Sequence, residues 1–374
     1  MPQTLRVMSI VGARPNFMKI APIVAQLKAA PDVFTSILVH TGQHYDEKLS
    51  KVFFDELGIP HTDFNLNVGS ASHAQQTAAI MAAFEPVVID HPPDVLIVVG
   101  DVNSTLACAL VASKLGIAVA HVEAGLRSFD RTMPEEINRL LTDQISDLLF
   151  TSEPGAADNL HREGIDASKI HFVGNVMIDT LLTHRAAARR QEVPARFDVT
   201  ARRYGLLTLH RPSNVDDPAT FERIIEAVAT ISRDVPVIFP VHPRTRPVLA
   251  RSVRASTLVA DGVLRPVDPL GYVDFLGLME ASRIVLTDSG GIQEETTILG
   301  VPCLTLRENT ERPATITHGT NQIVGTDPAR VIDAWRRAEA GAIEHRVPPL
   351  WDGQAARRIV DVLRQLRMPA AAAV

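Results

Sequence analysis

Short apolar runs alternate with longer helix-forming segments along the whole of this chain. The runs are Leu5–Val11, Ser36–His40, Val95–Val99, Ala118–Val122 and Leu148–Thr151 in the first half, and Tyr204–Thr208, Val237–Val241, Ile284–Thr287 and Cys303–Leu306 in the second. Strands rich in Val, Ile and Leu, separated by helical crossovers, are typical of parallel sheets covered by helices on both faces. We therefore expect an α/β fold with doubly wound parallel sheets.

The segments between these runs are predicted to be helices. They are Phe17–Ala30, Glu47–Leu57, His73–Asp90, Thr105–Leu115, Glu135–Ser146, Phe221–Ser232, Asp274–Ala281, Ile292–Leu299 and Ala355–Leu366. At 374 residues the chain exceeds what one hydrophobic core usually supports, so we expect two domains. A polar, arginine-rich stretch between His171 and Val193 separates the two sets of strands. Such domains place a ligand in the cleft between them, beside the carboxyl ends of the strands.

Composition excludes several classes of protein. The net charge of -6 and the lack of a long basic run argue against nucleic acid as the main partner. Cys108 and Cys303 lie in apolar surroundings without CxxC or Cys/His spacing, so we expect neither a disulfide framework nor a metal site. No apolar stretch approaches a membrane span, and the first residues begin a strand, so we expect a cytoplasmic protein without a membrane partner.

The segment TDSGGIQEE, Thr287–Glu295, predicts a strand that leads into a helix through Ser289, Gly290 and Gly291. Glycines at a helix start let an anion approach the first free N–H groups, where the helix dipole also favours negative charge. A phosphate would fit there, with the pair Glu294 and Glu295 one turn further on to accept sugar hydroxyls. The alternative is a tight turn with acidic residues in the first turns of the helix.

GARPN follows the first strand and places Arg14 at the carboxyl end of the sheet, with Lys19 one helical turn further on. The pattern is not GxGxxG, and GxxxxGK[ST] does not occur, so nicotinamide and ATP binding are poorly supported. A surface arginine and lysine at a turn are the alternative interpretation.

Carboxylates follow two of the predicted strands. Asp101 comes after VLIVV and Glu123 after the next strand, although Asp101 also suits the N-cap of the following helix. In TMPEEINR, Thr132 and Glu135 have capping-box spacing and Glu135 with Arg139 forms an i,i+4 pair. Because this helix starts at the same edge, we expect the carboxylates to converge, as general acid–base chemistry requires.

Histidines follow strands in the second half, at His210 in HRPSN and at His242 in VHPRT. Neither has metal-ligand spacing, and a lone histidine such as His242 is more often structural. In NTERP, the pair Glu311 and Arg312 suits a brace for the cleft or a phosphate contact. No G-x-S-x-G elbow appears, so serine hydrolase chemistry is unsupported.

Taken together, the motifs resemble those of the non-hydrolysing UDP-N-acetylglucosamine 2-epimerases. The motifs that carry the resemblance, in the family's order and over nearly the whole chain, are GARPNFMK, GQHYD, GDVNST, HVEAGLRS, MPEEINR, HRPSN, VHPRT, DSGGIQEE, NTERP and GTN. The resemblance implies a GT-B-like fold of two Rossmann-like domains with an interdomain cleft. It implies an N-terminal domain of residues 1–172 and a UDP-binding domain of 173–354, with 355–374 crossing back to the first.

The implied reaction converts UDP-N-acetylglucosamine to UDP-N-acetylmannosamine, a surface polysaccharide precursor, without a cofactor. UDP leaves C1 as C2 loses its proton, and re-adds to the 2-acetamidoglucal after C2 is reprotonated on the other face. The resemblance assigns catalysis to Asp101, Glu123, Glu135 and His210, and substrate binding to Arg14, Lys19, Glu136, Arg139, His242, Phe275, Ser289, Gly290, Gly291, Glu295 and Arg312. It also implies a homodimer.

Two departures from the family pattern affect the details. Gln43 and His44 remain from a motif associated with a second, allosteric UDP-sugar site, but the arginine of that motif is absent. After NTERP, Ala314 replaces the usual acidic residue, which leaves a sugar modified at C3 or C6 open. The alternative functions are a hydrolysing 2-epimerase, which releases free N-acetylmannosamine and UDP, and a GT-B glycosyltransferase.

Overall fold

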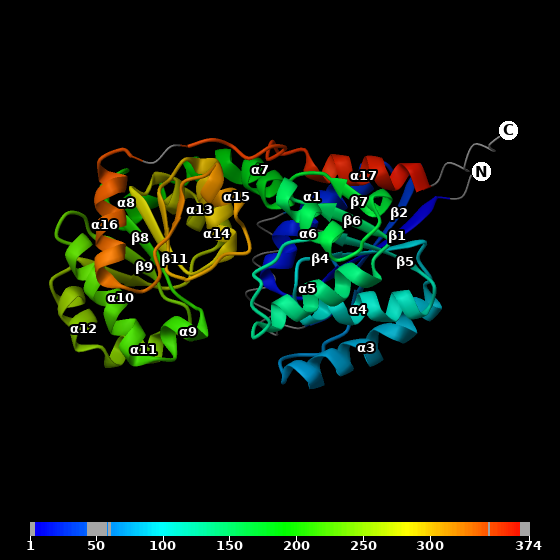
Figure 1. Cartoon of the computed structure of the whole chain (residues 1–374), viewed down its shortest axis with the longest axis horizontal. Helices are drawn as coiled ribbons and strands as arrows, with labels where there is room; N and C mark the ends of the chain where they lie inside the picture. Colours follow the sequence, from blue (N-terminus) through cyan, green and yellow to red (C-terminus); the bar gives the residue numbers. More distant parts are fainter. Residues whose placement is uncertain (1–3, 43–57, 59–60, 343–344, 367–374) are drawn as a thin grey trace. The chain divides into compact units, whose positions relative to one another are not determined.

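The computed structural model describes residues 4–42, 58, 61–342 and 345–366 (Figure 1). The chain forms two compact units: unit 1, Met1–Thr183 with Pro349–Val374, and unit 2, His184–Pro348. The first boundary lies inside helix α7 (Val176–Arg190), later than the residue 172 given by the sequence. Most of the arginine-rich stretch that was expected to separate the domains belongs to this helix. Alanine and arginine, which are frequent in it, are strong helix formers.

The described part of unit 1 is built on seven parallel strands in the order β3-β2-β1-β4-β5-β6-β7. Their bounds are β1 (Leu5–Val11), β2 (Phe34–His40), β3 (Phe64–Asn65), β4 (Val95–Val99), β5 (Ala118–Val122), β6 (Leu148–Thr151) and β7 (Ile170–Phe172). In register, Val7 of β1 pairs with Ser36 on one side and Val95 on the other. The order reverses between β1 and β4, where doubly wound sheets bind ligands.

Unit 2 repeats this order with six parallel strands among its described residues, β10-β9-β8-β11-β12-β13. Their bounds are β8 (Gly205–Thr208), β9 (Val237–Pro240), β10 (Leu264–Val267), β11 (Ile284–Thr287), β12 (Cys303–Thr305) and β13 (Asn321–Ile323). The order reverses between β8 and β11. The expected α/β fold with two doubly wound, Rossmann-like sheets is confirmed.

Helices cover both faces of each sheet (Figure 1). In unit 1, α1 (Arg14–Lys28) and α17 (Ala355–Leu366) pack together on one face, and α3 (His73–Asp90), α4 (Asn103–Lys114) and α5 (Pro134–Ile145) on the other. The remaining helices are α6 (Pro154–Arg162), α8 (Val193–Arg196), α9 (Pro212–Val215), α10 (Pro218–Ile231), α11 (Arg246–Arg251), α12 (Val253–Ala260), α13 (Tyr272–Ala281), α14 (Gly290–Leu299), α15 (Ala314–Thr317) and α16 (Pro328–Glu339). The helix expected at Glu47–Leu57 lies outside the described residues. In the described ranges, no helix combines the length and apolar character needed to cross a membrane.

Each unit has its own apolar core. In unit 1, Met8 and Leu96 of neighbouring strands pack with Phe84 of α3, and all three are buried. In unit 2, Leu286 of β11 packs in a cluster with Phe221 of α10. Burying one such side chain contributes roughly 1.5–3 kcal/mol, so these clusters fix how the helices lie on each sheet.

The segment after unit 2 returns to unit 1 and is anchored there. The backbone N–H groups of Ala355 and Ala356, which begin α17, donate to the carboxylate of Asp179 on α7 at 3.1 and 2.8 Å. The Trp351 indole N–H donates to the carbonyl of Ser152 at 2.8 Å. Burial raises the pKa of Asp179 to about 6, against the opposing effect of the two backbone hydrogen bonds. This carboxylate therefore caps the last described helix.

Candidate active site

The carboxyl ends of β1, β4 and β5 bring a buried ion pair together in unit 1. Lys19, in the second turn of the helix that follows β1, and Glu123, directly after β5, are both buried, and their Nζ and Oε2 atoms are 2.5 Å apart. Asn16, also on α1, donates its amide to the carbonyl of Val99 at 2.8 Å. Helix α1 is thus tied to the ends of both neighbouring strands, and its lysine neutralises Glu123.

The backbone around this pair takes unusual conformations. Glu123 has a φ of 69°, in the left-handed region that costs a non-glycine residue roughly 1 kcal/mol. Gly100, after β4, has a φ of 67°, and a Cβ there would lie 3.0 Å from the Lys19 ammonium nitrogen. Such strain is common where a side chain must point toward a ligand.

Asp101 is held by the helix that brings the other acidic residues. Arg139 on α5 donates to Asp101 Oδ2 from Nε at 3.0 Å and from Nη2 at 2.7 Å. The same guanidinium donates to Glu136 Oε2 at 2.5 Å, and this glutamate also accepts the backbone N–H groups of Ser128 and Phe129. Asp101 is not an N-cap, because the N-cap of α4 is Val102.

The capping box expected at the start of α5 is absent. The N-cap is Met133 without a side-chain hydrogen bond, and the Thr132 hydroxyl donates to Asp130 instead. The expected i,i+4 pair is also replaced, since Arg139 pairs with Glu136 and Asp101. Glu135 is half-buried and forms no hydrogen bond or ion pair to another described residue.

Three further residues expected in the first domain are Arg14, Gln43 and His44. Arg14 is the first residue of α1, the helix that also carries Lys19. Gln43 and His44 lie outside the described residues. Their roles stay predictions.

In unit 2, His210 follows β8 and pairs with Asp288, which follows β11. Its Nδ1 lies 2.7 Å from Asp288 Oδ1, and the carboxylate also accepts the backbone N–H groups of His210 and Arg211. Burial would raise the pKa of Asp288, but the hydrogen bond and charge of His210 outweigh it and hold the pKa below its usual value. Asp288 thus orients the ring. The exposed His242 lies beside it, with ring centroids 5.9 Å apart.

The start of α14 has the features of an anion site. Its N-cap, Ser289, is extended and makes no side-chain capping hydrogen bond. A Cβ on Gly290 would lie 2.7 Å from Nη1 of Arg312, so a guanidinium packs directly on this turn. A Cβ there would also lie 2.9 Å from Oε1 of Glu311, so a carboxylate packs on the same turn. The first N–H groups of a helix favour a negatively charged group.

Arg312 lies in a buried network of charges. Its guanidinium is 2.8 Å from Glu294 and 2.7 Å from Glu311, and Glu311 also accepts from Arg307 at 2.9 Å. Arg211 also lies 3.9 Å from Glu311, so three guanidinium groups share the two carboxylates. Whether Arg312 braces the site or contacts a phosphate stays a prediction.

Glu295 is buried beneath α13. The Tyr272 hydroxyl donates to its Oε1 at 3.0 Å. Burial raises the pKa of Glu295 to about 7; the tyrosine hydrogen bond opposes this rise and repulsion from Glu294 adds to it. Phe275, half-buried, lies on the same helix as Tyr272.

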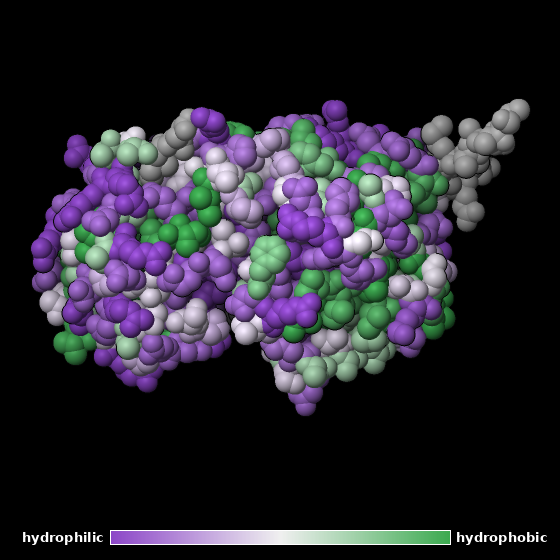
Figure 2. Space-filling view, in the orientation of Figure 1, coloured by the Kyte–Doolittle hydropathy of each residue, from purple (hydrophilic) through white to green (hydrophobic). Residues whose placement is uncertain are grey.

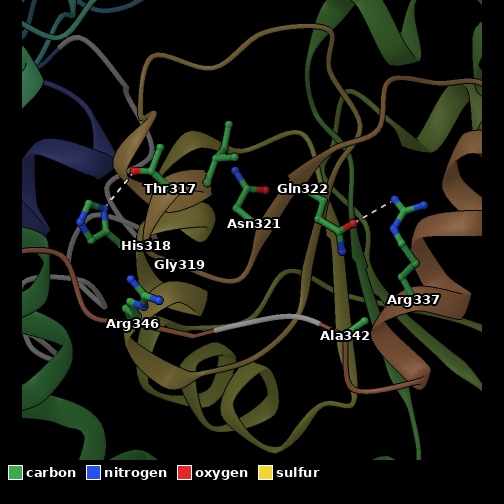
Figure 3. A pocket seen from close by; sticks show the side chains of 9 residues that line it. Thr317, His318, Gly319, Asn321, Gln322, Arg337, Ala342 and Arg346 are labelled. Carbon is green, nitrogen blue, oxygen red and sulfur yellow. Dashed lines mark hydrogen bonds between the residues drawn. The ribbon is translucent and has the colours of Figure 1, made fainter.

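A separate pocket of about 450 Å³ lies in unit 2 and contains none of the expected site residues (Figure 3). Its lining residues are Ile316, Thr317, His318, Gly319, Asn321, Gln322, Arg337, Ala342 and Arg346. Arg337 donates to the side chain of Gln322 at 3.0 Å, as Figure 3 shows. The pocket adjoins β13, at the edge of the sheet, away from the switch point between β8 and β11.

Sequence reasoning missed several partners of the expected residues. Asp288 directly follows a buried strand, so the argument used for Asp101 would have found it. No sequence pattern indicates Tyr272, because it approaches Glu295 only through the packing of α13 on α14.

The raised pKa of Glu295 predicts how stability depends on pH. The unfolded carboxyl ionises near pH ~4.3 and the folded one near pH 7, so the folded state binds the extra proton between these values. The free energy of unfolding of unit 2 should therefore fall as pH rises through this window, by roughly 4 kcal/mol at most. Glu295→Gln should remove this component. Urea unfolding followed by tryptophan fluorescence measures it, in a Trp351→Phe background that leaves Trp335 of unit 2 as the one reporter. Parallel pH curves for the two proteins would contradict the assignment.

Comparison with known proteins identifies the family. A family model described as UDP-N-acetylglucosamine 2-epimerase matches residues 25–364. The UDP-N-acetylglucosamine 2-epimerase of Methanocaldococcus jannaschii is 44% identical over 364 residues, 95% of this chain and 97% of that protein. The UDP-2,3-diacetamido-2,3-dideoxy-D-glucuronate 2-epimerase of Pseudomonas aeruginosa is 41% identical, over 97% of this chain and 100% of that protein.

Solved structures agree with these matches. A crystal structure of the M. jannaschii UDP-GlcNAc 2-epimerase in complex with UDP-GlcNAc and UDP has a TM-score of 0.87 and 42% identity, covering 96% of this chain and 100% of that chain. The GT-B-like fold expected from the sequence is confirmed by this match. The chain belongs to the UDP-N-acetylglucosamine 2-epimerase family, whose members are carbohydrate isomerases.

Proposed function

We propose that this protein interconverts UDP-N-acetylglucosamine and UDP-N-acetylmannosamine without hydrolysis. The carrying observation is that Asp101 and Glu123 end neighbouring strands and that each is paired with a cation from a helix. Two fixed carboxylates at one edge of a sheet suit proton transfer at carbon. The M. jannaschii relative, crystallised with UDP-GlcNAc and UDP, supports this choice of substrate.

In the proposed reaction a base removes the proton from C2. The electrons of the C2–H bond form the C1=C2 double bond, and the C1–O bond breaks to release UDP. An acid then delivers a proton to the opposite face of the 2-acetamidoglucal, and the UDP oxygen bonds again to C1. Protonation on the opposite face needs more than one proton-carrying group, and we assign Asp101, Glu123 and Glu135 to this set.

Unit 2 holds the nucleotide in this proposal. The diphosphate lies at the start of α14, on Ser289, Gly290 and Gly291, where open N–H groups stabilise the charge that grows as UDP leaves. Glu295 contacts the ribose and Phe275 the uracil. His210, oriented by Asp288, donates to the departing diphosphate. Arg14, Lys19 and His242 complete the substrate contacts.

A second substrate class has its own support. The P. aeruginosa relative is named for a diacetamido glucuronate, which differs from N-acetylglucosamine at C3 and C6. Ala314 is buried at the start of α15, where the family pattern has an acidic residue. Loss of an acidic side chain there would suit a sugar that carries a carboxylate.

Proton NMR in deuterated water tests the reaction. With UDP-N-acetylglucosamine and no added cofactor, we expect deuterium at C2 and a new anomeric signal from UDP-N-acetylmannosamine. Asp101→Asn and Glu123→Gln should each lower turnover on the order of 100-fold or more, because proton transfer loses a positioned group. The same exchange at the exposed Glu85 on α3 should leave turnover unchanged.

The other possible outcomes of the NMR experiment and of the two carboxylate variants point to different conclusions. Free N-acetylmannosamine with UDP would place the protein among hydrolysing 2-epimerases. Exchange only with the diacetamido substrate would favour the second class. No reaction with either would redirect the search to a glycosyltransferase and its acceptor. Full activity in both carboxylate variants would reject the assigned roles.

Ser289→Ala should weaken UDP binding about tenfold, since hydrogen bonds to charged groups contribute roughly 1.5–3 kcal/mol. Ser252, the N-cap of α12, is the matched control, because its side chain accepts from the Ala255 N–H at 3.1 Å. Ser252→Ala should lower stability but keep UDP affinity, and Ser289→Ala should do the reverse. Calorimetric titration with UDP measures the affinity, and equal affinities for the two variants would place the diphosphate elsewhere.

We also propose that the protein forms a homodimer. Apolar side chains show at the surface over α4 and α5 in Figure 2, where Ile137 and Leu141 are 45% and 48% exposed. Sedimentation velocity should give twice the mass of one chain, and Ile137→Lys with Leu141→Lys should shift it toward one. A single-chain mass for the unaltered protein would refute the proposal.

A further inference from the structure

His121 occupies an unusual place within the sheet of unit 1. It lies on β5 and is fully buried. Its Nδ1 is 2.6 Å from Asp143 Oδ1, and its Nε2 is 2.8 Å from the carbonyl oxygen of Gly100. Both partners are acceptors, whereas a neutral imidazole carries a single N–H. Both hydrogen bonds therefore form only when both ring nitrogens carry protons.

Asp143 completes the arrangement from α5. It is fully buried, and its second oxygen accepts the Gly125 N–H at 3.1 Å and Arg127 Nη2 at 2.6 Å. Burial would raise the pKa of Asp143, but attraction to His121 and Arg127 and their hydrogen bonds hold it below its usual value. Arg127 also pairs with Glu163 at 2.6 Å.

This pair connects the segments that carry the assigned acids. Gly100 immediately precedes Asp101, and Gly125 comes two residues after Glu123. Asp143 lies two turns after Glu135 on α5. Both glycines have positive φ, 67° and 79°, a region that glycine adopts readily and other residues rarely do. Loss of the His121 ring would release the Gly100 carbonyl, which directly precedes Asp101.

We propose that His121, with Asp143, is a positioning residue for epimerisation: it fixes the turns that aim Asp101 and Glu123 and does not itself touch the substrate. This rests on the proposed function. The competing account is that the pair only stabilises unit 1. Stability alone would lower the melting temperature without changing the turnover of folded enzyme.

The kinetic test uses His121→Gln, Asp143→Asn and the double variant in the full-length chain. His171→Gln is the matched control, because His171 lies on β7 of the same sheet and is partly buried outside the site. We expect kcat to fall at least tenfold in each site variant, with KM and UDP affinity near those of the unaltered enzyme. The double variant should lose about as much as either single one, since residues that act as a unit are not additive.

A second experiment, NMR spectroscopy of the unaltered protein, needs no variant. In the ¹⁵N-histidine-labelled unaltered protein near pH 6, one histidine should show signals from two slowly exchanging ring N–H groups. A spectrum without such a residue would overturn the proposal, and this outcome can be observed even if the variants do not fold.

The remaining outcomes separate the two proposals. If folded His121→Gln or Asp143→Asn keeps a kcat within twofold of the unaltered enzyme, the positioning proposal is overturned and the proposed function is not. Fully additive losses would do the same, because they show independent effects. An unaltered enzyme without epimerase activity would overturn the proposed function, and this inference with it.

Discussion

Charge buried away from water must be balanced by opposite charge, and the site geometry depends on this constraint. Lys19 faces Glu123, Arg127 faces Asp143, and in unit 2 Arg312 lies between two glutamates. Removing one member of a buried pair costs about 3–5 kcal/mol, since the other is left uncompensated. In each buried pair, the cation therefore helps to hold its carboxylate in position. The position of the assigned acids follows from electrostatic pairing as much as from apolar packing.

The long strands and their carboxyl-end residues could be predicted, because a buried strand has a continuous apolar run and a fixed direction. The structure places Asp101 after β4 and Glu123 after β5, as that pattern required. The short strands β3, β7, β10 and β13 were not predicted. Their sequences, FN, IHF, LRPV and NQI, contain polar residues in place of a continuous apolar run.

The partners of the site residues were harder to predict than the residues themselves. Arg139 chooses Glu136 and Asp101 over the expected Glu135, because the turn after β4 approaches α5 in space. The spacing of residues along a helix shows which ion pairs are possible, and contacts with other elements determine which ion pair forms. Asp143 had no signal in sequence, since nothing local indicates that His121 on a separate strand needs a counter-charge.

The capping of α17 by Asp179 has a consequence for how the chain is made. Unit 2 is complete once residue 348 has been synthesised, whereas unit 1 still lacks the helix that packs on α1. Until then the Asp179 carboxylate has no helix start to bind, and the apolar surface that α17 covers stays open. During synthesis, the half of the protein that begins first should be the last to finish folding.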